Sequence, residues 1–80
     1  MNRLEGKLIA LIGSGNMGSA IVGALLHQKE LNPDSITASD PYPDQRDLIA
    51  AKYGIQVTGE NQEAVQDADI VILSVKPQVL

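Results

Sequence analysis

Cysteine, phenylalanine and tryptophan are absent from this chain, and its 80 residues include only two tyrosines. Without cysteine, the chain can form neither a disulfide framework nor a metal site built from thiolates. Lysine and arginine number 6 against 10 acidic residues and form no cluster, which excludes the usual signature of a nucleic-acid partner or an anionic membrane surface. No apolar run approaches the roughly 20 residues of a membrane-spanning helix, and the opening "MNRLEGK" has no signal-peptide core. We therefore expect a cytoplasmic protein.

Aliphatic side chains supply most of the apolar content that remains. Hydrophobic residues make up 44% of the chain, which is typical of a globular protein rather than a disordered one. The core must therefore be built from isoleucine, leucine, valine and alanine. A chain of this length forms one small domain with little interior.

Apolar runs and helical periodicities alternate along the chain. We expect strands at 7–12, 36–39, 55–58 and 70–75, and helices at 16–28, 44–53 and just after Asn61. The first and last strands are continuously apolar, as in strands covered on both faces, whereas "IQVT" alternates like a half-exposed strand. This order predicts an α/β fold: a Rossmann-like parallel sheet in the order 3-2-1-4, with helices on both faces, truncated after the fourth strand.

The first helix is expected to turn one apolar face towards the sheet. That face comprises Met17, Ile21, Ala24 and Leu25, with Ala20 beside them. Gly23 costs about 1 kcal/mol relative to alanine in a helix interior, and close packing against the sheet would explain it.

The two later helices carry shorter apolar faces. Leu48 and Ile49 form the expected face of the second helix, which Gly54 ends. Asn61 is expected to be the N-cap of a short third helix that carries Ala64, Val65 and Ala68.

Three glycines follow the first strand in the pattern G-x-G-x-x-G, where the strand gives way to a helix. Gly13 permits the tight turn, Gly15 lets a diphosphate approach the backbone, and Gly18 lets the helix pack closely on the strand. The amides of Asn16 and Met17 would then point at the phosphates, assisted by the helix dipole. The alternative is that the glycines serve only turns and packing, with Asn16 as a cap and Met17 in the core.

Asp40 follows Gly18 at about the 20-residue spacing at which dinucleotide-binding proteins carry an acidic residue. A carboxylate there accepts hydrogen bonds from the ribose hydroxyls of NAD and repels the 2′-phosphate of NADP, so NAD(H) is favoured. NADP(H) is the alternative, with Ser39 and Tyr42 as donors, and the nearest basic residue, Arg46, is on the next helix. A second interpretation is that Asp40 only shapes the Asp-Pro turn.

Three stretches, "IGSGNMGSAIVGALL", "AAKYGIQV" and "ENQEAVQDADIVILSVKPQVL", together resemble the N-terminal half of pyrroline-5-carboxylate reductase, from about residue 7 to residue 80. The resemblance implies a pyrophosphate loop formed by Gly13, Ser14, Gly15, Asn16, Met17 and Gly18. It also implies that Asn61 lies near the adenosine ribose, and that Val75, Lys76 and Pro77 line the nicotinamide-ribose side. Lys76 has the alternative of being a solvated charge at a strand end. Relatives often carry serine, threonine or asparagine where Asp40 stands, which puts a preference for NADPH in doubt.

The resemblance further implies an enzyme that reduces the cyclic imine 1-pyrroline-5-carboxylate to L-proline with NADPH or NADH. In that family a helical C-terminal domain forms the dimer and the imine pocket. We therefore expect residues 1–80 to be the N-terminal dinucleotide-binding domain of a larger enzyme, inactive alone, and we assign it no catalytic or metal-ligating residue. The alternatives are the cofactor domain of a related β-hydroxyacid or 6-phosphogluconate-type dehydrogenase, and a non-catalytic nucleotide-binding module.

A fourth strand with a bare edge has one further consequence. The expected edge comprises Ile70, Val71, Ile72, Leu73 and Val75. Because an unpaired apolar edge seeks a partner strand, we expect the chain to self-associate as a homo-oligomer.

Overall fold

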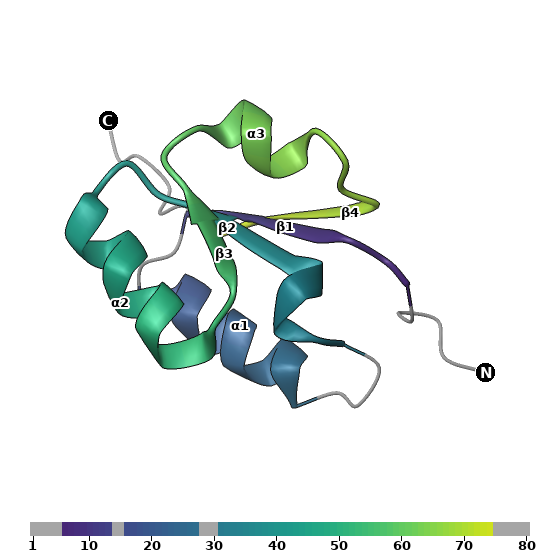
Figure 1. Cartoon of the computed structure of the whole chain (residues 1–80), viewed down its shortest axis with the longest axis horizontal. Coiled ribbons are helices and arrows are strands. Elements are labelled where there is room, and N and C mark those ends of the chain that lie inside the picture. The colour runs from purple at the N-terminus through teal and green to yellow at the C-terminus, as the bar shows by residue number, and fades with distance from the viewer. Residues whose placement is uncertain (1–5, 14–15, 28–30, 75–80) are drawn as a thin grey trace.

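The computed structural model describes residues 6–13, 16–27 and 31–74. In chain order the elements are β1 (Ile9–Ile12), α1 (Asn16–Leu26), the 3₁₀ turn η1 (Pro33–Ser35), β2 (Ile36–Ser39), α2 (Pro43–Tyr53), β3 (Gln56–Thr58), α3 (Asn61–Val65) and β4 (Ile70–Leu73). Within the described ranges, the strands form one parallel sheet in the order β3-β2-β1-β4 (Figure 1). The predicted fold class and strand order are confirmed.

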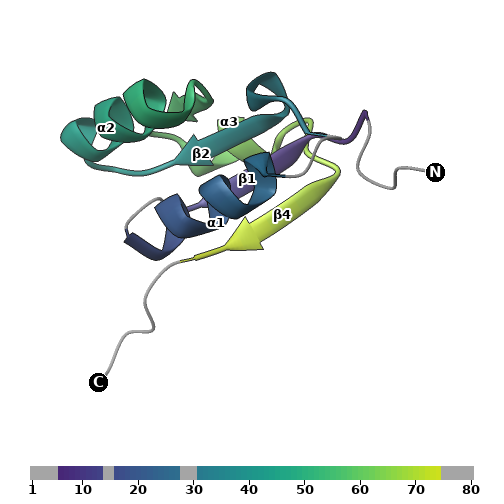
Figure 2. The ribbon, with the colours of Figure 1, turned by 90° about the horizontal axis from the view of Figure 1, so that it is seen from below.

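Helices cover the sheet unequally on its two faces. Helices α1 and α2 lie on one face, and the short helix α3 crosses the other on the way from β3 to β4 (Figures 1 and 2). In β1, which lies between β2 and β4, successive side chains alternate between these layers. Ile9 and Leu11 join the cluster under α1 and α2, whereas Ala10 and Ile12 pack with Ala64 of α3. β1 is thus buried along its whole length, as its continuous apolar run predicts.

The larger core lies beneath α1 and α2. Its buried members are Ile9, Leu11, Val22, Leu31, Ile36, Ala38, Ile49 and Ile55. Both of the packing helices contribute one fully buried residue to it, Val22 from α1 and Ile49 from α2. The side chains are aliphatic, as the composition requires.

The predicted apolar faces of α1 and α2 are partly wrong. Val22, which the prediction left out, is the buried hydrophobic side chain among the described residues of α1, while Ala20 and Ala24 are exposed. Leu48 in α2 is 57% exposed although its neighbour Ile49 is fully buried. Residues 21, 22, 24, 25 and 26 are all apolar, so they form an arc too wide for periodicity to show which part faces the sheet.

Gly23 does not serve the contact that the sequence suggested. A Cβ atom at this position would lie 3.2 Å from the hydroxyl of Tyr53, so Gly23 accommodates a side chain of α2 rather than the sheet. The hydroxyls of Tyr53 and Ser19 are 3.2 Å apart, which adds a polar contact between the same two helices.

The helix boundaries differ from prediction at several points. Tyr42 is the N-cap of α2 and Pro43 is its first residue, while Gly54 ends the helix as predicted, with a left-handed φ of 71°. The prediction that Asn61 caps α3 is wrong, because Glu60 is the N-cap and Asn61 is already helical. No helix in the part of the chain that the structure describes is long and apolar enough to cross a membrane.

Candidate functional site

The carboxyl ends of the parallel strands meet at one edge of the sheet. The amide of Gly13, just after β1, donates to the carbonyl of Ser39 at 2.9 Å. The amide of Asp40, just after β2, donates to the carbonyl of Thr58 at 3.0 Å. These bonds extend the sheet beyond the strands and fix the residues that follow β1 and β2. In open parallel sheets ligands bind at this edge.

Gly13 and Gly18 enclose the turn between β1 and α1. Gly13 has a φ of 89°, a conformation that residues with side chains rarely adopt. A Cβ atom on Gly18 would lie only 2.5 Å from the carbonyl oxygen of Gly13. Both packing roles predicted for these glycines are therefore confirmed: Gly13 makes the turn, and Gly18 allows α1 to begin against the end of β1.

Ser74 belongs to this edge although sequence reasoning gave it no role. It follows β4 and is buried, and its hydroxyl donates to the carbonyl of Gly13. The carbonyl of Ile12 lies 3.3 Å from the same hydroxyl. The available signal was a single polar residue in the apolar run "IVILSV", but its partners lie more than 60 residues earlier in the chain.

Asp40 lies at the end of β2 as predicted, and its side chain shapes the turn that follows. Its Oδ1 accepts a hydrogen bond from the amide of Tyr42 at 2.9 Å, and the residue is only 7% exposed. A carboxylate that binds the amide two residues later stabilises an Asp-Pro turn. Asp40 therefore does shape this turn; that this is its only role, and that it contacts a ribose, both stay predictions.

Arg46 reaches the same strand end from α2. Its Nη1 donates to the carbonyl of Asp40 at 2.8 Å. A Cβ atom on Gly59, just after β3, would lie 2.9 Å from that nitrogen, so the guanidinium passes close over the backbone there. The sequence placed Arg46 on the next helix but did not indicate that its side chain folds back over the ends of β2 and β3.

Asn61 is brought to the site by a buried serine. The hydroxyl of Ser39, which is fully buried, donates to Oδ1 of Asn61 at 2.6 Å. Asn61 is exposed, so its remaining polar groups face solvent beside the end of β2. Because its hydroxyl proton is already donated to Asn61, Ser39 is poorly placed to serve as the donor to a 2′-phosphate that the sequence allowed.

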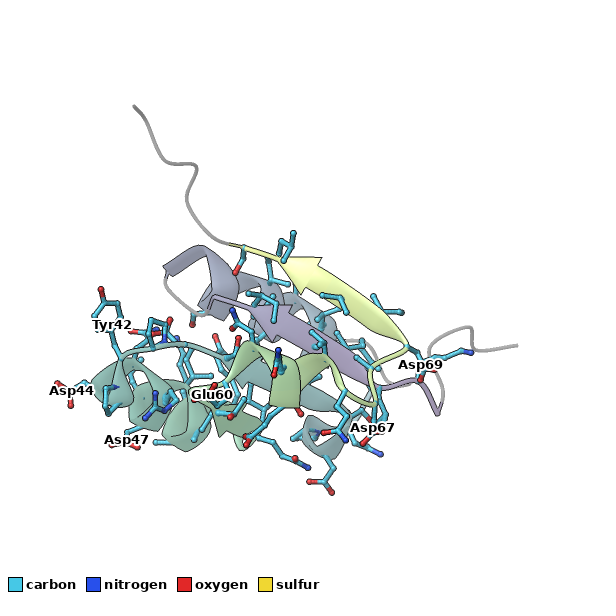
Figure 3. All side chains as sticks on the ribbon, turned by 90° about the horizontal axis from the view of Figure 1, so that it is seen from above. Tyr42, Asp44, Asp47, Glu60, Asp67 and Asp69 are labelled. Atoms are coloured by element: carbon cyan, nitrogen blue, oxygen red, sulfur yellow. The ribbon has the colours of Figure 1, made fainter. Side chains whose placement is uncertain are left out.

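Acidic side chains surround this end of the molecule. Asp44, Asp47 and Glu60 are exposed and lie towards the same end as Tyr42, whereas Asp67 and Asp69 lie towards the other end (Figure 3). Tyr42 is 70% exposed and projects outwards. Asp44, Asp47 and Glu60 thus form an acidic rim at this end, and the guanidinium of Arg46 lies at the same strand end as Asp40.

The structure brings four of the predicted cofactor residues to one edge: Gly13, Gly18, Asp40 and Asn61. Ser14, Gly15, Val75, Lys76 and Pro77 lie outside the described residues, as do the side chains of Asn16 and Met17. Their predicted roles stay predictions.

Tyr53 is the titratable group with a shifted pKa among the described residues, and it lies between α1 and α2. The hydrogen bond with Ser19 lowers the pKa of Tyr53 below its usual value, and Lys52 lowers it further, while partial burial opposes both. The Lys52 ammonium lies 5.3 Å from the centre of the Tyr53 ring. None of these groups adjoins Gly13 or Asp40, so we assign them to helix packing.

A separate cavity of about 390 Å³ opens on the α3 side of the sheet. It is lined by Leu8, Asp34, Ser35, Thr37, Gln56, Val57, Thr58, Glu63, Ala64, Asp67 and Ala68. None of the predicted cofactor residues that the structure describes lines it. Among the described residues there is no cluster of three or more histidines or acidic residues placed to hold a metal ion.

Comparison with known proteins identifies relatives over nearly the whole chain. A family model described as "NADP oxidoreductase coenzyme F420-dependent" matches residues 8–80. The chain is 49% identical over 72 residues to a pyrroline-5-carboxylate reductase of Pseudomonas aeruginosa, covering 90% of this chain and 26% of the relative. It is 44% identical over 77 residues to one from Methanosarcina acetivorans, covering 96% of this chain and 28% of the relative.

A solved structure shows the same fold. A pyrroline-5-carboxylate reductase from Coxiella burnetii superposes with a TM-score of 0.82 at 34% identity, over 89% of this chain and 26% of the other. The resemblance read from the sequence is thereby confirmed. The chain spans about a quarter of the length of these relatives, however, and not the half that the sequence analysis expected.

Proposed function

This chain belongs to the family described as NADP oxidoreductase, coenzyme F420-dependent, and we propose that it is the dinucleotide-binding part of a pyrroline-5-carboxylate reductase. Relatives of that name match it at up to 49% identity, and a structure of that name matches its fold. In this proposal residues 1–80 form the N-terminal domain, and a helical domain beyond it completes the substrate site. The whole protein would reduce 1-pyrroline-5-carboxylate to L-proline.

The observation that carries this proposal is the close approach of Gly18 to the carbonyl of Gly13 at the carboxyl end of β1. A helix that begins so near a strand end presents its first amides, and the positive end of its dipole, at the edge where parallel sheets bind ligands. Gly13 to Gly18 would hold the diphosphate, with Asn61 near the adenosine ribose. Val75, Lys76 and Pro77 would lie along the nicotinamide ribose.

The chemistry of the reduction lies in the cofactor, since bound reduced nicotinamide supplies the hydride that adds to the C=N carbon of the imine. The residues of this chain would bind the dinucleotide and orient it. In this proposal the imine pocket is formed by the helical domain beyond these residues. We therefore propose that these 80 residues bind cofactor but do not turn over imine by themselves.

NAD(H) is the proposed cofactor, with NADP(H) as the alternative. Asp40 places a carboxylate at the end of β2, which disfavours the additional charge of a 2′-phosphate. The guanidinium of Arg46 at the same strand end supports the alternative, as does the NADP in the family description.

Calorimetric titration of the chain with NADH and with NADPH tests the proposal. We expect saturable binding of both at one site, with tighter binding of NADH, and only weak competition from adenosine, which lacks the diphosphate. Tighter binding of NADPH would mean that Arg46, rather than Asp40, determines which cofactor is preferred. Failure of both nucleotides to bind would contradict a dinucleotide function for this edge of the sheet.

Self-association through β4 is also proposed. In the described sheet β4 pairs only with β1, and its Val71 and Leu73 side chains are 47% and 71% exposed. Sedimentation velocity over a concentration series should show dimers or larger species, because an unpaired apolar edge pairs readily with another strand. Leu73→Lys should restore the monomer, whereas Leu48→Lys, which charges an exposed leucine on α2, should not. A monomer at all concentrations would contradict the proposal.

A further inference from the structure

Ser74 is a buried polar residue that the proposed cofactor site leaves without a role. It lies just beyond β4 and is 9% exposed. Its backbone amide donates to the carbonyl of Ile12 at 2.9 Å, which continues the pairing of β4 with β1. Its hydroxyl donates to the next carbonyl along, that of Gly13. The end of β4 is therefore joined to the glycine turn by a side chain as well as by the backbone.

The backbone amide and the carbonyl of Gly13 form hydrogen bonds with two different strand ends. Its amide donates to Ser39 of β2 at 2.9 Å, while its carbonyl accepts from Ser74 beyond β4. In a planar trans peptide the C=O and N–H groups point to opposite sides, so the direction of this carbonyl sets the orientation of the whole peptide unit. A glycine needs such restraint because it can change its backbone angles at little steric cost.

The start of α1 packs against the same bonded pair. A Cβ atom on Gly18 would lie 2.5 Å from the Gly13 carbonyl oxygen and 3.0 Å from Oγ of Ser74. The acceptor is thus enclosed by the ends of β1 and β4 and by the first turn of α1. Gly13 is only partly buried, so loss of the serine hydroxyl would remove the hydrogen bond that fixes the direction of its carbonyl rather than leave a buried acceptor without a partner. The backbone at Gly13 would then be freer to rotate.

We propose that Ser74 is a positioning residue for cofactor binding. Its hydroxyl holds the Gly13 carbonyl towards β4 and so keeps the turn after β1 in the orientation that receives the diphosphate of a dinucleotide. The inference rests on the proposed function of the turn. It adds a residue just beyond β4 to the glycine motif, whose residues otherwise all lie between the end of β1 and the start of α1.

Ser74→Ala tests this role by removing only the hydroxyl. We expect NADH to bind about tenfold more weakly, the upper range for loss of one buried hydrogen bond. Ser74→Thr keeps the hydroxyl and should restore most of the affinity. Ser19→Ala is the matched control, because Ser19 follows Gly18 in α1 but its hydroxyl contacts Tyr53 instead of the turn. That variant should bind NADH as the parent does.

Binding of two further ligands distinguishes a positioning role of Ser74 from a general loosening of the fold. ADP-ribose contains the diphosphate and AMP does not, so Ser74→Ala should weaken ADP-ribose and leave AMP unchanged. An equal loss for both ligands, or an equal loss in Ser19→Ala, would overturn the inference, as would parental NADH affinity in Ser74→Ala. Absence of NADH binding by the parent chain would instead contradict the proposed function itself, so the two failures are distinguishable.

Discussion

Gly18→Ala should destabilise the fold by about 2 kcal/mol and weaken NADH binding by more than about tenfold, because the added methyl group has no space. Its carbon would lie 2.5 Å from the carbonyl oxygen of Gly13, well inside van der Waals contact. Backbone cannot move aside as the end of a side chain can, so α1 must shift away from β1. That shift displaces the amides proposed to bind the diphosphate. Urea unfolding and calorimetric titration measure the two effects.

Gly23→Ala provides the control within the same helix. The new methyl group would lie 3.2 Å from the hydroxyl of Tyr53, a side-chain atom that can give way, and alanine favours the helix by about 1 kcal/mol. The two effects should nearly cancel, and NADH affinity should stay at the parental value. If Gly18→Ala behaved like Gly23→Ala, α1 would not be held against the turn as described.

Asp40→Asn should shift the choice between cofactors towards NADPH by about tenfold, through removal of one negative charge near the place proposed for the 2′-phosphate. The asparagine keeps an oxygen that can accept the amide of Tyr42, so the turn after β2 should persist. NADH should bind more weakly, since a carboxylate is the stronger acceptor for ribose hydroxyls. The ratio of the two dissociation constants is the quantity to measure.

Asp44→Asn removes an equal charge from an exposed position in the first turn of α2. Because exposed charges are screened by water and salt, the ratio should change by less than about twofold. A shift as large as that of Asp40→Asn would mean that the general field of the acidic rim sets the preference. No shift in either variant would show that neither carboxylate discriminates between the cofactors.

The strand order was predictable because the apolar pattern of a strand depends on how much of it the sheet and helices cover. "LIALI" and "IVIL" are apolar without interruption, which suits the two neighbouring strands 1 and 4 of the order 3-2-1-4, and "IQVT" alternates as an edge strand does. In the structure β1 is buried throughout, and β3 lies at the edge. The prediction was wrong for β4, whose residues are largely exposed because β1 is its only partner strand in the described sheet.

The site was predictable where a motif or the family resemblance marked its residues, as at Gly13, Gly18, Asp40 and Asn61. Gly13 and Gly18 form a local pattern, and their contact follows from the geometry of a strand that turns into a helix. The partners of Ser74 lie more than 60 residues away, and the guanidinium of Arg46 reaches Asp40 only through the path of a long, flexible side chain. Contacts of these two kinds depend on tertiary packing, which neither spacing nor periodicity encodes.

Because the helices cover the two faces of the sheet unequally, the two helical layers should differ in how readily they unfold locally. On the side of the short helix, the buried members of the packed core among the described residues are Ala10, Ile12 and Ala64. Opening that layer exposes little apolar surface, so it costs far less free energy than separating α1 and α2 from the sheet. In native-state hydrogen exchange, the amide hydrogens of α3 should therefore exchange through local fluctuations. Those that link β1 to β2 should exchange only when the whole molecule unfolds.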